Sequence, residues 1–248
     1  MIHAASIGDI AALPSTKEAL LRIRGAADVY GVDRSFCRFW VDDNGGALMV
    51  SEGVATLYPA DSLDEWALFL TMSPDVQTVR TTAAAARELA IAWQTEATCG
   101  HVMRAENVSV CGDSTETPPA ALYPLICDVF GNAIPPFDAW YADVHHRMRR
   151  GAFHTRGVCE EGKVLSCAMT VAQCDNAVLL GAVATHPSAR GRGLASACVT
   201  SLTAYYQQEG KSVYISPKND KAEDLYRRLG FVVCGEWGRI DKIGNSVF

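Results

Sequence analysis

The sequence lacks the features that mark several large classes of protein. It holds only 10 prolines and 20 glycines in 248 residues, too few for a collagen-like or low-complexity chain. With 49% hydrophobic and 20% charged residues, it is too apolar for intrinsic disorder. No stretch approaches the roughly 18 uninterrupted apolar residues of a membrane helix, so we expect no membrane span. What remains is a globular chain long enough for one large or two small domains.

Positive charge is also scarce. Lys and Arg number 22 against 28 Asp and Glu, which gives 22 − 28 = −6 at pH 7. A protein that wraps nucleic acid needs a basic stripe, so nucleic acid is not an expected partner. The first residues lack a basic region followed by an apolar stretch and a cleavage site. We therefore expect no secretory signal and a cytoplasmic protein.

The cysteines lack the spacing of a metal site or a disulfide framework. They are odd in number and contain no C-x-x-C pair. His145 and His146 are adjacent and would face different ways on a helix, which disfavours a shared zinc ion. We expect no metal and free thiols in a reducing cytosol, many of them small apolar fillers. The nine are Cys37, Cys99, Cys111, Cys127, Cys159, Cys167, Cys174, Cys198 and Cys234.

A polar, proline-terminated stretch at residues 111–119 predicts a linker between domains 1–110 and 120–248. The N-terminal part has the pattern of a small mixed α/β unit, but it contains no phosphate loop, nucleophile elbow or clustered acid-base set. Its expected elements are a helix at 15–24, strands at 36–41 and 47–58 around the turn 43–46, a helix at 62–72, a strand at 76–81 and a helix at 82–93.

The C-terminal part alternates between helical and strand periods. The expected order is α-β-β-α-β-α-β, which predicts an α/β fold with a mixed sheet and helices on its faces. The expected elements are a helix over 137–150, strands at 163–172 and 177–185, a helix from 194 to 209, a strand at 212–216, a helix at 220–229 and a strand from 231.

The most informative stretch lies between the second of these strands and the following helix. There Arg190-Gly-Arg-Gly-Leu-Ala195 places glycines and arginines at a helix N-terminus. Unpaired N–H groups, the positive end of the helix dipole and close backbone approach at glycine all favour a bound diphosphate. Ser196 stands where the nicotinamide fingerprint needs glycine, and no G-K-[ST] of a Walker loop is present. In isolation, a tight turn with solvated arginines fits the six residues equally well.

The residues that follow at fixed intervals give the pattern its specificity. R-x-x-G-x-A at Arg190–Ala195 is followed by N-x-x-A-x-x-L-Y-x-x-L-G-F at Asn219–Phe231. With this combination the sequence resembles the GNAT superfamily of acyl-CoA-dependent N-acetyltransferases over residues 119–248. The N-terminal unit is also reminiscent of a degenerate GNAT-like half. The resemblance therefore implies a GNAT-like acyl-CoA N-acyltransferase fold in two tandem units.

The resemblance also implies roles for named residues. Tyr226 occupies the position of the general acid, against the alternative of a core aromatic on the stripe 222, 225, 226 and 229. Asn219 would orient the cofactor or the leaving group, or only cap the helix that begins at Asp220. Acetyl-CoA is the implied co-substrate. Its implied binding residues are Val183, Ala184, Thr185, Arg190, Gly191, Arg192, Gly193, Leu194, Ala195 and Asn219.

No residue stands out as the base that would deprotonate the acceptor. The candidates Glu160, Glu161 and Asp175 sit in expected turns, where carboxylates are usually solvated. His186 titrates in the right range but lies at the diphosphate turn, and a chain of water molecules is an equal alternative. Cys167 and Cys198 have no positioned base and are expected to be packing residues.

The sequence thus predicts an enzyme that transfers an acetyl group from acetyl-CoA to a primary amine of a small molecule or peptide by direct attack in a ternary complex. A non-catalytic CoA-binding sensor or interaction module is the alternative, because no base is evident. A longer acyl donor or an amino-acid acceptor is a third reading. The oligomeric state and the acceptor stay open.

Overall fold

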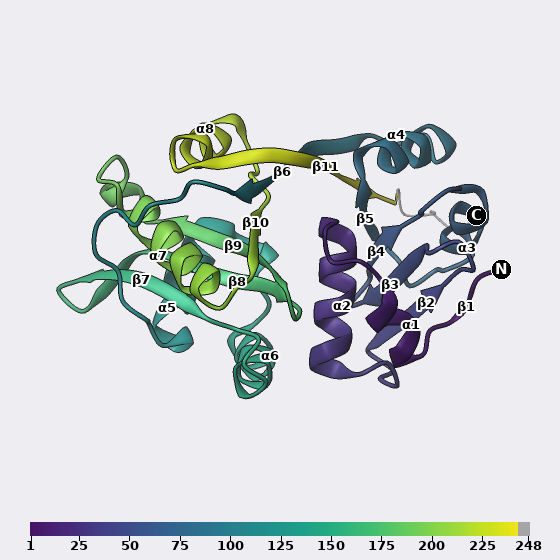
Figure 1. Cartoon of the computed structure of the whole chain (residues 1–248), viewed down its shortest axis with the longest axis horizontal. Coiled ribbons are helices and arrows are strands. Elements are labelled where there is room, and N and C mark those ends of the chain that lie inside the picture. The colour runs from purple at the N-terminus through teal and green to yellow at the C-terminus, as the bar shows by residue number, and fades with distance from the viewer. Residues whose placement is uncertain (243–248) are drawn as a thin grey trace. The chain divides into compact units, whose positions relative to one another are not determined.

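A computed structural model describes residues 1–242, which form two compact units (Figure 1). Unit 1 contains residues 1–102 together with the chain from 234 onward, and unit 2 contains residues 103–233. The chain passes from one unit to the other inside two strands, β6 (Ala97–Ala105) and β11 (Phe231–Asp241). Each unit is described below by itself.

Unit 1 is a mixed sheet with two helices on each face. Its strands lie in the order β1-β2-β3-β4-β5-β11, with β4 and β5 parallel and the other neighbouring pairs antiparallel. The elements are β1 (His3–Ala4), α1 (Ile7–Ala12), α2 (Glu18–Tyr30), β2 (Cys37–Val41), β3 (Ala47–Ser51), β4 (Val54–Tyr58), α3 (Asp64–Thr71), β5 (Thr78–Thr82) and α4 (Ala83–Ala92).

The strand expected over residues 47–58 is in fact a hairpin. Strand β3 ends at Ser51, and β4 begins at Val54 and runs antiparallel to it. The two residues between them, Glu52 and Gly53, have φ values of 49° and 76°. Two consecutive residues with positive φ form a tight turn whose twist matches that of the two strands. Of the two residues here, only glycine commonly adopts this conformation. Glutamate at the first position hid the turn from the sequence pattern.

Alternation along the strands gives unit 1 two apolar layers. Side chains of α1 and α2, including Ile10 and Ile23, pack with Phe39 on one face of the sheet. On the other face Trp66 of α3 and Leu89 of α4 pack among strand residues. All five of these side chains are at most 4% exposed, so both layers hold the sheet firmly.

Unit 2 has the strand order β6-β10-β9-β8-β7, with β9 and β10 parallel. Unit 2 contains helix α5 and strand β7, which the sequence analysis does not predict. Pro124 interrupts the helical pattern of α5, and the exposed end of β7 weakens its strand pattern. The elements are α5 (Pro119–Phe130), a 3-10 turn at Gly131–Ala133, α6 (Phe137–Arg149), β7 (Thr155–Glu160), β8 (Lys163–Gln173), β9 (Ala177–Thr185), a 3-10 turn at Pro187–Ala189, α7 (Leu194–Gln208), β10 (Ser212–Ile215) and α8 (Asp220–Arg228).

The sheet of unit 2 also has two covered faces. Cys198 and Leu202 of α7 pack on the face that carries Ala168 of β8. The neighbouring residue Cys167 points the other way and packs with Leu122 of α5. Because side chains alternate along a strand, β8 is buried on both faces, and its backbone is fixed in the centre of the unit.

The compact units do not coincide with the predicted domains 1–110 and 120–248. The stretch 111–119 lies inside unit 2, where the backbone N–H of Thr117 donates to Thr155 Oγ1 at 3.2 Å and that of Cys111 donates to Thr200 Oγ1 at 3.1 Å. The residues that the sequence marks as a linker are therefore tied to β7 and α7 of unit 2.

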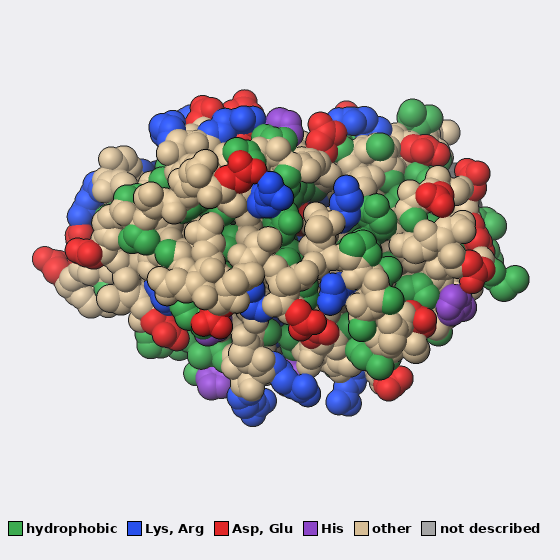
Figure 2. Space-filling model, in the orientation of Figure 1, with side chains coloured by type: hydrophobic (Ala, Val, Ile, Leu, Met, Phe, Trp, Pro, Cys, Tyr) green, Lys and Arg blue, Asp and Glu red, His purple; other side chains and the backbone are tan. Residues whose placement is uncertain are grey.

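Two further features concern the chain's surroundings. Among residues 1–242, no helix has both the length and the apolar composition that crossing a bilayer requires. On the face drawn in Figure 2, basic and acidic side chains are interspersed over the surface. The expectation that nucleic acid is not a partner stays a prediction.

Candidate active site

Strand β9 carries a bulge at the centre of unit 2. Two residue-to-residue steps along β8, from Cys167 to Met169, span the same ladder distance as three steps along β9, from Ala184 to Gly181. The extra residue lies at Ala182, whose φ of 46° is left-handed and unusual for a residue other than glycine. A bulge removes backbone groups from the ladder, so the segment beside Val183 presents polar groups that its own sheet does not use.

The parallel ladder between β9 and β10 stops before this bulge. Its pairs run from Ala177 with Ser212 to Leu180 with Ile215. Beyond Leu180, β9 continues to Thr185 with no β10 partner among the described residues. A slot therefore opens between the carboxyl ends of two parallel strands, the usual position of a ligand in a sheet of this kind.

The N-terminus of α7 closes one end of the slot. Gly191 and Gly193 precede the helix with φ values of 78° and 77°, a left-handed conformation that favours glycine. A Cβ at either position would meet no heavy atom within 4 Å. Protein packing does not require these glycines; the backbone turn does, and the space beside it is open to an anion.

These elements surround a pocket of about 590 Å³. Its cations are Arg190, Lys221 and Arg228, and no Asp or Glu is among its described lining residues. Three cations and an open helix N-terminus favour an anionic ligand. The pocket is lined by Val129, Val183, Thr185, Ala189, Arg190, Gly191, Gly193, Leu194, Ala195, Ser196, Lys221, Ala222, Leu225, Tyr226 and Arg228.

Eight of the predicted site residues therefore line one pocket, namely Val183, Thr185, Arg190, Gly191, Gly193, Leu194, Ala195 and Tyr226. Ala184 does not, because its side chain is 1% exposed and packs on the α5 side of the sheet. As the neighbour of Val183 and Thr185 on a strand, it points to the opposite face. Only its backbone faces the slot's edge.

The segment Arg190–Ala195 at the N-terminus of α7 is called the cradle below. Its two arginines differ in their surroundings. Arg190 lines the pocket, and its Nε donates to the carbonyl of Thr185 at 3.4 Å. Arg192 instead forms an ion pair with Glu160 at the end of β7 and is not among the pocket-lining residues. This partner raises the pKa of Arg192. The charge expected from Arg192 is thus shared with a carboxylate, while Arg190 remains directed to the pocket.

Tyr226 lies at the pocket wall and in the core at once. Its side chain is 5% exposed and packs against Phe231, with ring centroids 6.0 Å apart. Burial raises the pKa of Tyr226, so the phenol stays protonated at neutral pH. Both interpretations of this residue, core aromatic and proton donor, are compatible with the position, and its catalytic role stays a prediction.

Asn219 caps α8. Its Oδ1 accepts the backbone N–H of Ala222 at 3.0 Å, and the residue is not part of the pocket lining. The cap satisfies one of the free N–H groups of the first helical turn. Of the two roles considered for Asn219, the hydrogen bond from Ala222 shows the capping role.

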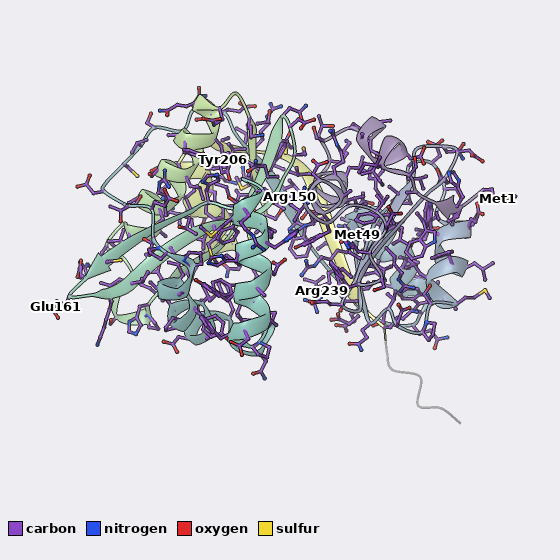
Figure 3. The ribbon with its side chains drawn as sticks, turned by 90° about the horizontal axis from the view of Figure 1, so that it is seen from below. Met1, Met49, Arg150, Glu161, Tyr206 and Arg239 are labelled. Atoms are coloured by element: carbon purple, nitrogen blue, oxygen red, sulfur yellow. The ribbon has the colours of Figure 1, made fainter. Side chains whose placement is uncertain are left out.

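None of the candidate bases reaches the pocket lining. Glu160 pairs with Arg192, and Glu161 lies at the tip of the β7–β8 hairpin (Figure 3). His186 Nδ1 lies 2.7 Å from Ser188 Oγ in the 3-10 turn. Asp175 is in the turn between β8 and β9, where its carbonyl accepts from Lys211. The described lining of the pocket therefore contains no carboxylate or imidazole that could deprotonate the acceptor.

The buried thiols are poor nucleophiles. Burial raises the pKa of Cys167 to about 12 and that of Cys198 to about 11. Both side chains are fully buried within the apolar layers of unit 2. Because the thiolate is the reactive form, these environments suit packing and disfavour nucleophilic catalysis.

The sequence interpretation missed two of the pocket's cations and part of its wall. Lys221 and Arg228 are seven residues apart on α8 and share the face of Leu225, an i, i+4, i+7 spacing that is readable in the sequence. Val129 comes from α5, a helix that the sequence analysis did not predict. The bulge at Ala182 has no sequence signal, since alanine seldom adopts positive φ.

Comparison with known proteins gives a family match for the part of the chain that holds the pocket. Residues 120–231 match the family model described as the Acetyltransferase (GNAT) family. These residues are a GNAT acetyltransferase domain. The GNAT match begins one residue into α5 and ends at the first residue of β11, so it covers the whole pocket.

Solved structures similar to this chain extend the likeness beyond the GNAT domain. A GCN5-related N-acetyltransferase from Kribbella flavida has a TM-score of 0.63 at 15% identity and covers 95% of this chain and 98% of its own. A putative GNAT acetyltransferase from Novosphingobium aromaticivorans has a TM-score of 0.58 at 16% identity, with 90% and 97% covered. A tandem GNAT protein from the clavulanic acid biosynthesis pathway has a TM-score of 0.62 at 13% identity, with 98% of both chains covered.

At these identities the likeness concerns the fold. Because it covers both units, the GNAT-like mixed α/β fold predicted from the sequence is confirmed, including its resemblance to a tandem protein. The GNAT family supports a transferase that uses an acyl-CoA, typically acetyl-CoA, as co-substrate.

Proposed function

We propose that this protein is an N-acetyltransferase that moves the acetyl group of acetyl-CoA to a primary amine by direct attack in a ternary complex. One observation carries the proposal: the glycine cradle at the N-terminus of α7, the bulged end of β9 and Tyr226 all line the same cation-rich pocket. The family match supports the acyl-CoA co-substrate.

The residues of the pocket divide the binding task. The backbone around Gly191 and Gly193 and the side chain of Arg190 hold the diphosphate, because these groups present N–H donors and positive charge. The unpaired edge of β9 at Val183–Thr185 binds the pantetheine arm in the way an added strand is bound. Lys221 and Arg228 on α8 supply further charge toward the phosphates.

The chemical step needs an oxyanion donor and a proton donor. The amine nitrogen attacks the thioester carbon, and the negative charge that develops on the carbonyl oxygen is stabilised by a backbone N–H at the bulge near Val183. The C–S bond then breaks, and the thiolate takes a proton from Tyr226, which is later reprotonated from solvent. Because burial raises the pKa of this phenol, the proton has to move as the C–S bond breaks.

The amine must also lose a proton, and we assign this to water. No carboxylate or imidazole belongs to the pocket's described lining. A bound chain of water molecules leading to solvent fulfils the same role without a side-chain base. The acceptor is therefore an amine that reaches the slot partly in its neutral form.

Two measurements test the proposal. Isothermal titration with acetyl-CoA should give one saturable site, and release of free thiol should increase when a panel of primary amines is added. Absence of binding at millimolar acetyl-CoA would overturn the proposal. Inorganic phosphate at equal ionic strength is the control for binding by charge alone.

A CoA-dependent sensor is the second candidate, favoured by the same lack of a base among the residues that line the pocket. A sensor binds acetyl-CoA without turnover. Saturable binding combined with no thiol release across the panel would favour this candidate. A preference for a longer acyl donor would appear in the same assay when acyl chain length is varied.

A further inference from the structure

Unit 2 contains a second pocket, about 470 Å³ in volume, where α5 begins (Figure 1). Its walls come from three parts of the chain: residues 116–119 at the start of α5, one face of α6, and residues 153–155 at the start of β7. It shares no residue with the lining of the pocket that holds the cradle. The volume is within the usual range for small-molecule sites. We call it the ring pocket below.

Aromatic and imidazole rings form much of the ring pocket. Tyr141 and His145 are one turn apart on α6, with ring centroids separated by 4.5 Å and a hydrogen bond of 2.9 Å between the Tyr141 hydroxyl and His145 Nε2. Phe137 stacks on Tyr141 with centroids 5.1 Å apart. The rings of Phe153 and His154 come from the residues that precede β7. Because the rings of α6 support one another, this wall is in place before a ligand binds.

The imidazole of His154 is uncharged at neutral pH. The side chain is partly buried, and its ring packs against Tyr205 of α7 with centroids 4.7 Å apart. Burial is the main cause that lowers the pKa of His154, and the carboxylate of Glu116 opposes the shift. An imidazole ordinarily titrates near about pH 6.5, so a lowered pKa leaves this ring neutral at pH 7. It therefore does not repel a cation.

A single carboxylate gives the ring pocket its charge. Of the Asp, Glu, Lys and Arg residues, only Glu116 belongs to the described lining. The Glu116 side chain is exposed, and it forms no ion pair within residues 1–242. A carboxylate without a cationic partner, set beside the negative faces of aromatic rings, produces a negative potential in the pocket.

Two arginines lie near the ring pocket but outside its lining. Arg147 lies over the ring of Phe153, 5.1 Å from its centroid, and donates to the carbonyl of Thr170 at 3.0 Å. Arg156 donates to Ser201 Oγ at 3.1 Å. Because protein acceptors already bind both guanidinium groups, the Glu116 carboxylate is left to a ligand.

We propose that the ring pocket binds a hydrophobic organic ammonium ion. The Glu116 carboxylate and the faces of Tyr141 and His154 hold the cationic nitrogen, because ring faces attract cations. Phe153 and Met148 contact the apolar part of the ligand. An anion would meet the Glu116 carboxylate, and a neutral apolar ligand would leave that carboxylate without a counter-charge. The site does not depend on the proposed function.

The test follows amide signals of the full-length ¹⁵N-labelled protein during titration with 2-phenylethylammonium chloride, with no acetyl-CoA present. The neutral match is 2-phenylethanol, the anionic match is 3-phenylpropionate, and sodium chloride controls for ionic strength. We expect saturable shifts of the Thr117 and Thr155 amides with the ammonium ion, at least tenfold weaker binding of the alcohol and no saturation with the carboxylate.

Variants link these shifts to the proposed contacts. Glu116→Gln should weaken binding of the ammonium ion at least fivefold and change binding of the alcohol less than twofold. Its melting temperature should stay that of the wild type, because the side chain is exposed and forms no ion pair within the described chain. Glu161→Gln is the matched control, since Glu161 is an exposed carboxylate of unit 2 outside the ring pocket, and its affinity should be unchanged.

Three results would overturn the proposal. The first is equal affinity for the ammonium ion and the alcohol, which would show that charge plays no part. The second is equal affinity of Glu116→Gln and the wild type for the ammonium ion. The third is a set of shifts confined to the cradle amides, such as that of Gly191, with none at Thr117 and Thr155, which would place the amine in the other pocket.

Discussion

At the scale of single residues, Tyr226 joins two environments that usually exclude each other. It is packed in the core of unit 2 and yet lines the pocket that holds the cradle. Packing fixes the ring, so the position of the phenol oxygen is set before any ligand binds. A fixed proton donor needs no reorganisation during the reaction, which is what efficient general acid catalysis requires.

The first prediction concerns this oxygen. Tyr226→Phe should lower kcat about 100-fold, within the range for loss of a general acid, while the Kd for acetyl-CoA changes less than twofold. The ring and its packing against Phe231 are kept, so stability should stay close to that of the wild type. Steady-state thiol release and isothermal titration measure the two quantities.

The pH dependence of the wild type provides a second readout for the same role. Burial raises the pKa of Tyr226, so the phenol stays protonated through the ordinary tyrosine range near about pH 10. We expect kcat not to fall on the alkaline side up to that pH. An unchanged rate in Tyr226→Phe would remove the residue as the proton donor and leave it as a core aromatic.

The sequence carried much of the site at this scale, and particular residues show where it stopped. Glycine and arginine at a helix start fit either a bound anion or a solvated turn, and the residues that follow at fixed intervals favour the anion, so the sequence places Arg190 in the pocket that it lines. Arg192 carries the same signal, but its ion pair with Glu160 depends on the end of β7, a strand absent from the sequence pattern. Long-range partners of this kind are not encoded in local spacing.

At the scale of elements, the N-terminus of α7 depends on a backbone that only glycine adopts easily. Gly191 has a φ of 78°, and the space around its missing Cβ is empty. A methyl group there would strain the turn and enter the space that the diphosphate needs. The strain and the blocked space are two separate effects, and a matched glycine separates them.

The second prediction uses that match. Gly191→Ala should weaken acetyl-CoA binding about tenfold or more and lower stability by about 1 kcal/mol, the usual cost of a left-handed alanine. Gly151, at the end of α6, has a φ of 67° and equally open surroundings but does not line the pocket. Gly151→Ala should therefore lose similar stability and keep its affinity. Thermal unfolding and isothermal titration decide, and equal affinity losses would contradict the cradle.

Elements with a strong period were predictable, and irregular ones were not. Helix α7 and strands β8 and β9 follow from their apolar patterns, because one or both faces are buried along their length. The bulge in β9 and the turn at Glu52 arise from positive φ at Ala182 and Glu52, where the residue type gives no hint. Irregular backbone of this sort is set by tertiary packing, and the bulge in β9 lies where the slot opens.

At the scale of the whole molecule, the two units do not follow one another along the chain, because unit 1 combines an N-terminal stretch with the last described strand. Strand β10 of unit 2 pairs with β6, which follows the N-terminal elements, and β5 of unit 1 pairs with β11, which ends the described chain. A composition shift cannot reveal this arrangement, because each strand is local in sequence and its partner is distant. The predicted domain 120–248 therefore lacks a strand of unit 2 and contains one of unit 1.

The third prediction tests that dependence. Ending the chain after residue 233 removes the β11 segment Trp237–Asp241 from the edge of β5, together with Ile240, a core residue that is 1% exposed. It also removes Lys242, whose Nζ donates to the carbonyl of Ser73 at 2.9 Å. We expect unit 1 to unfold or to melt well below the full-length protein.

Hydrogen exchange along the chain measures this effect locally. Amides of β4 and β5 should lose protection, whereas a chain ending after residue 242 should keep it, because that cut leaves every described pairing in place. Ile240→Ala in the full chain gives the smaller change, with an expected cost of about 2 to 5 kcal/mol for a large-to-small core substitution. Full protection of β5 in the chain that ends at 233 would show that unit 1 folds without its distant strand, and the boundary predicted from the sequence would then be the physical one.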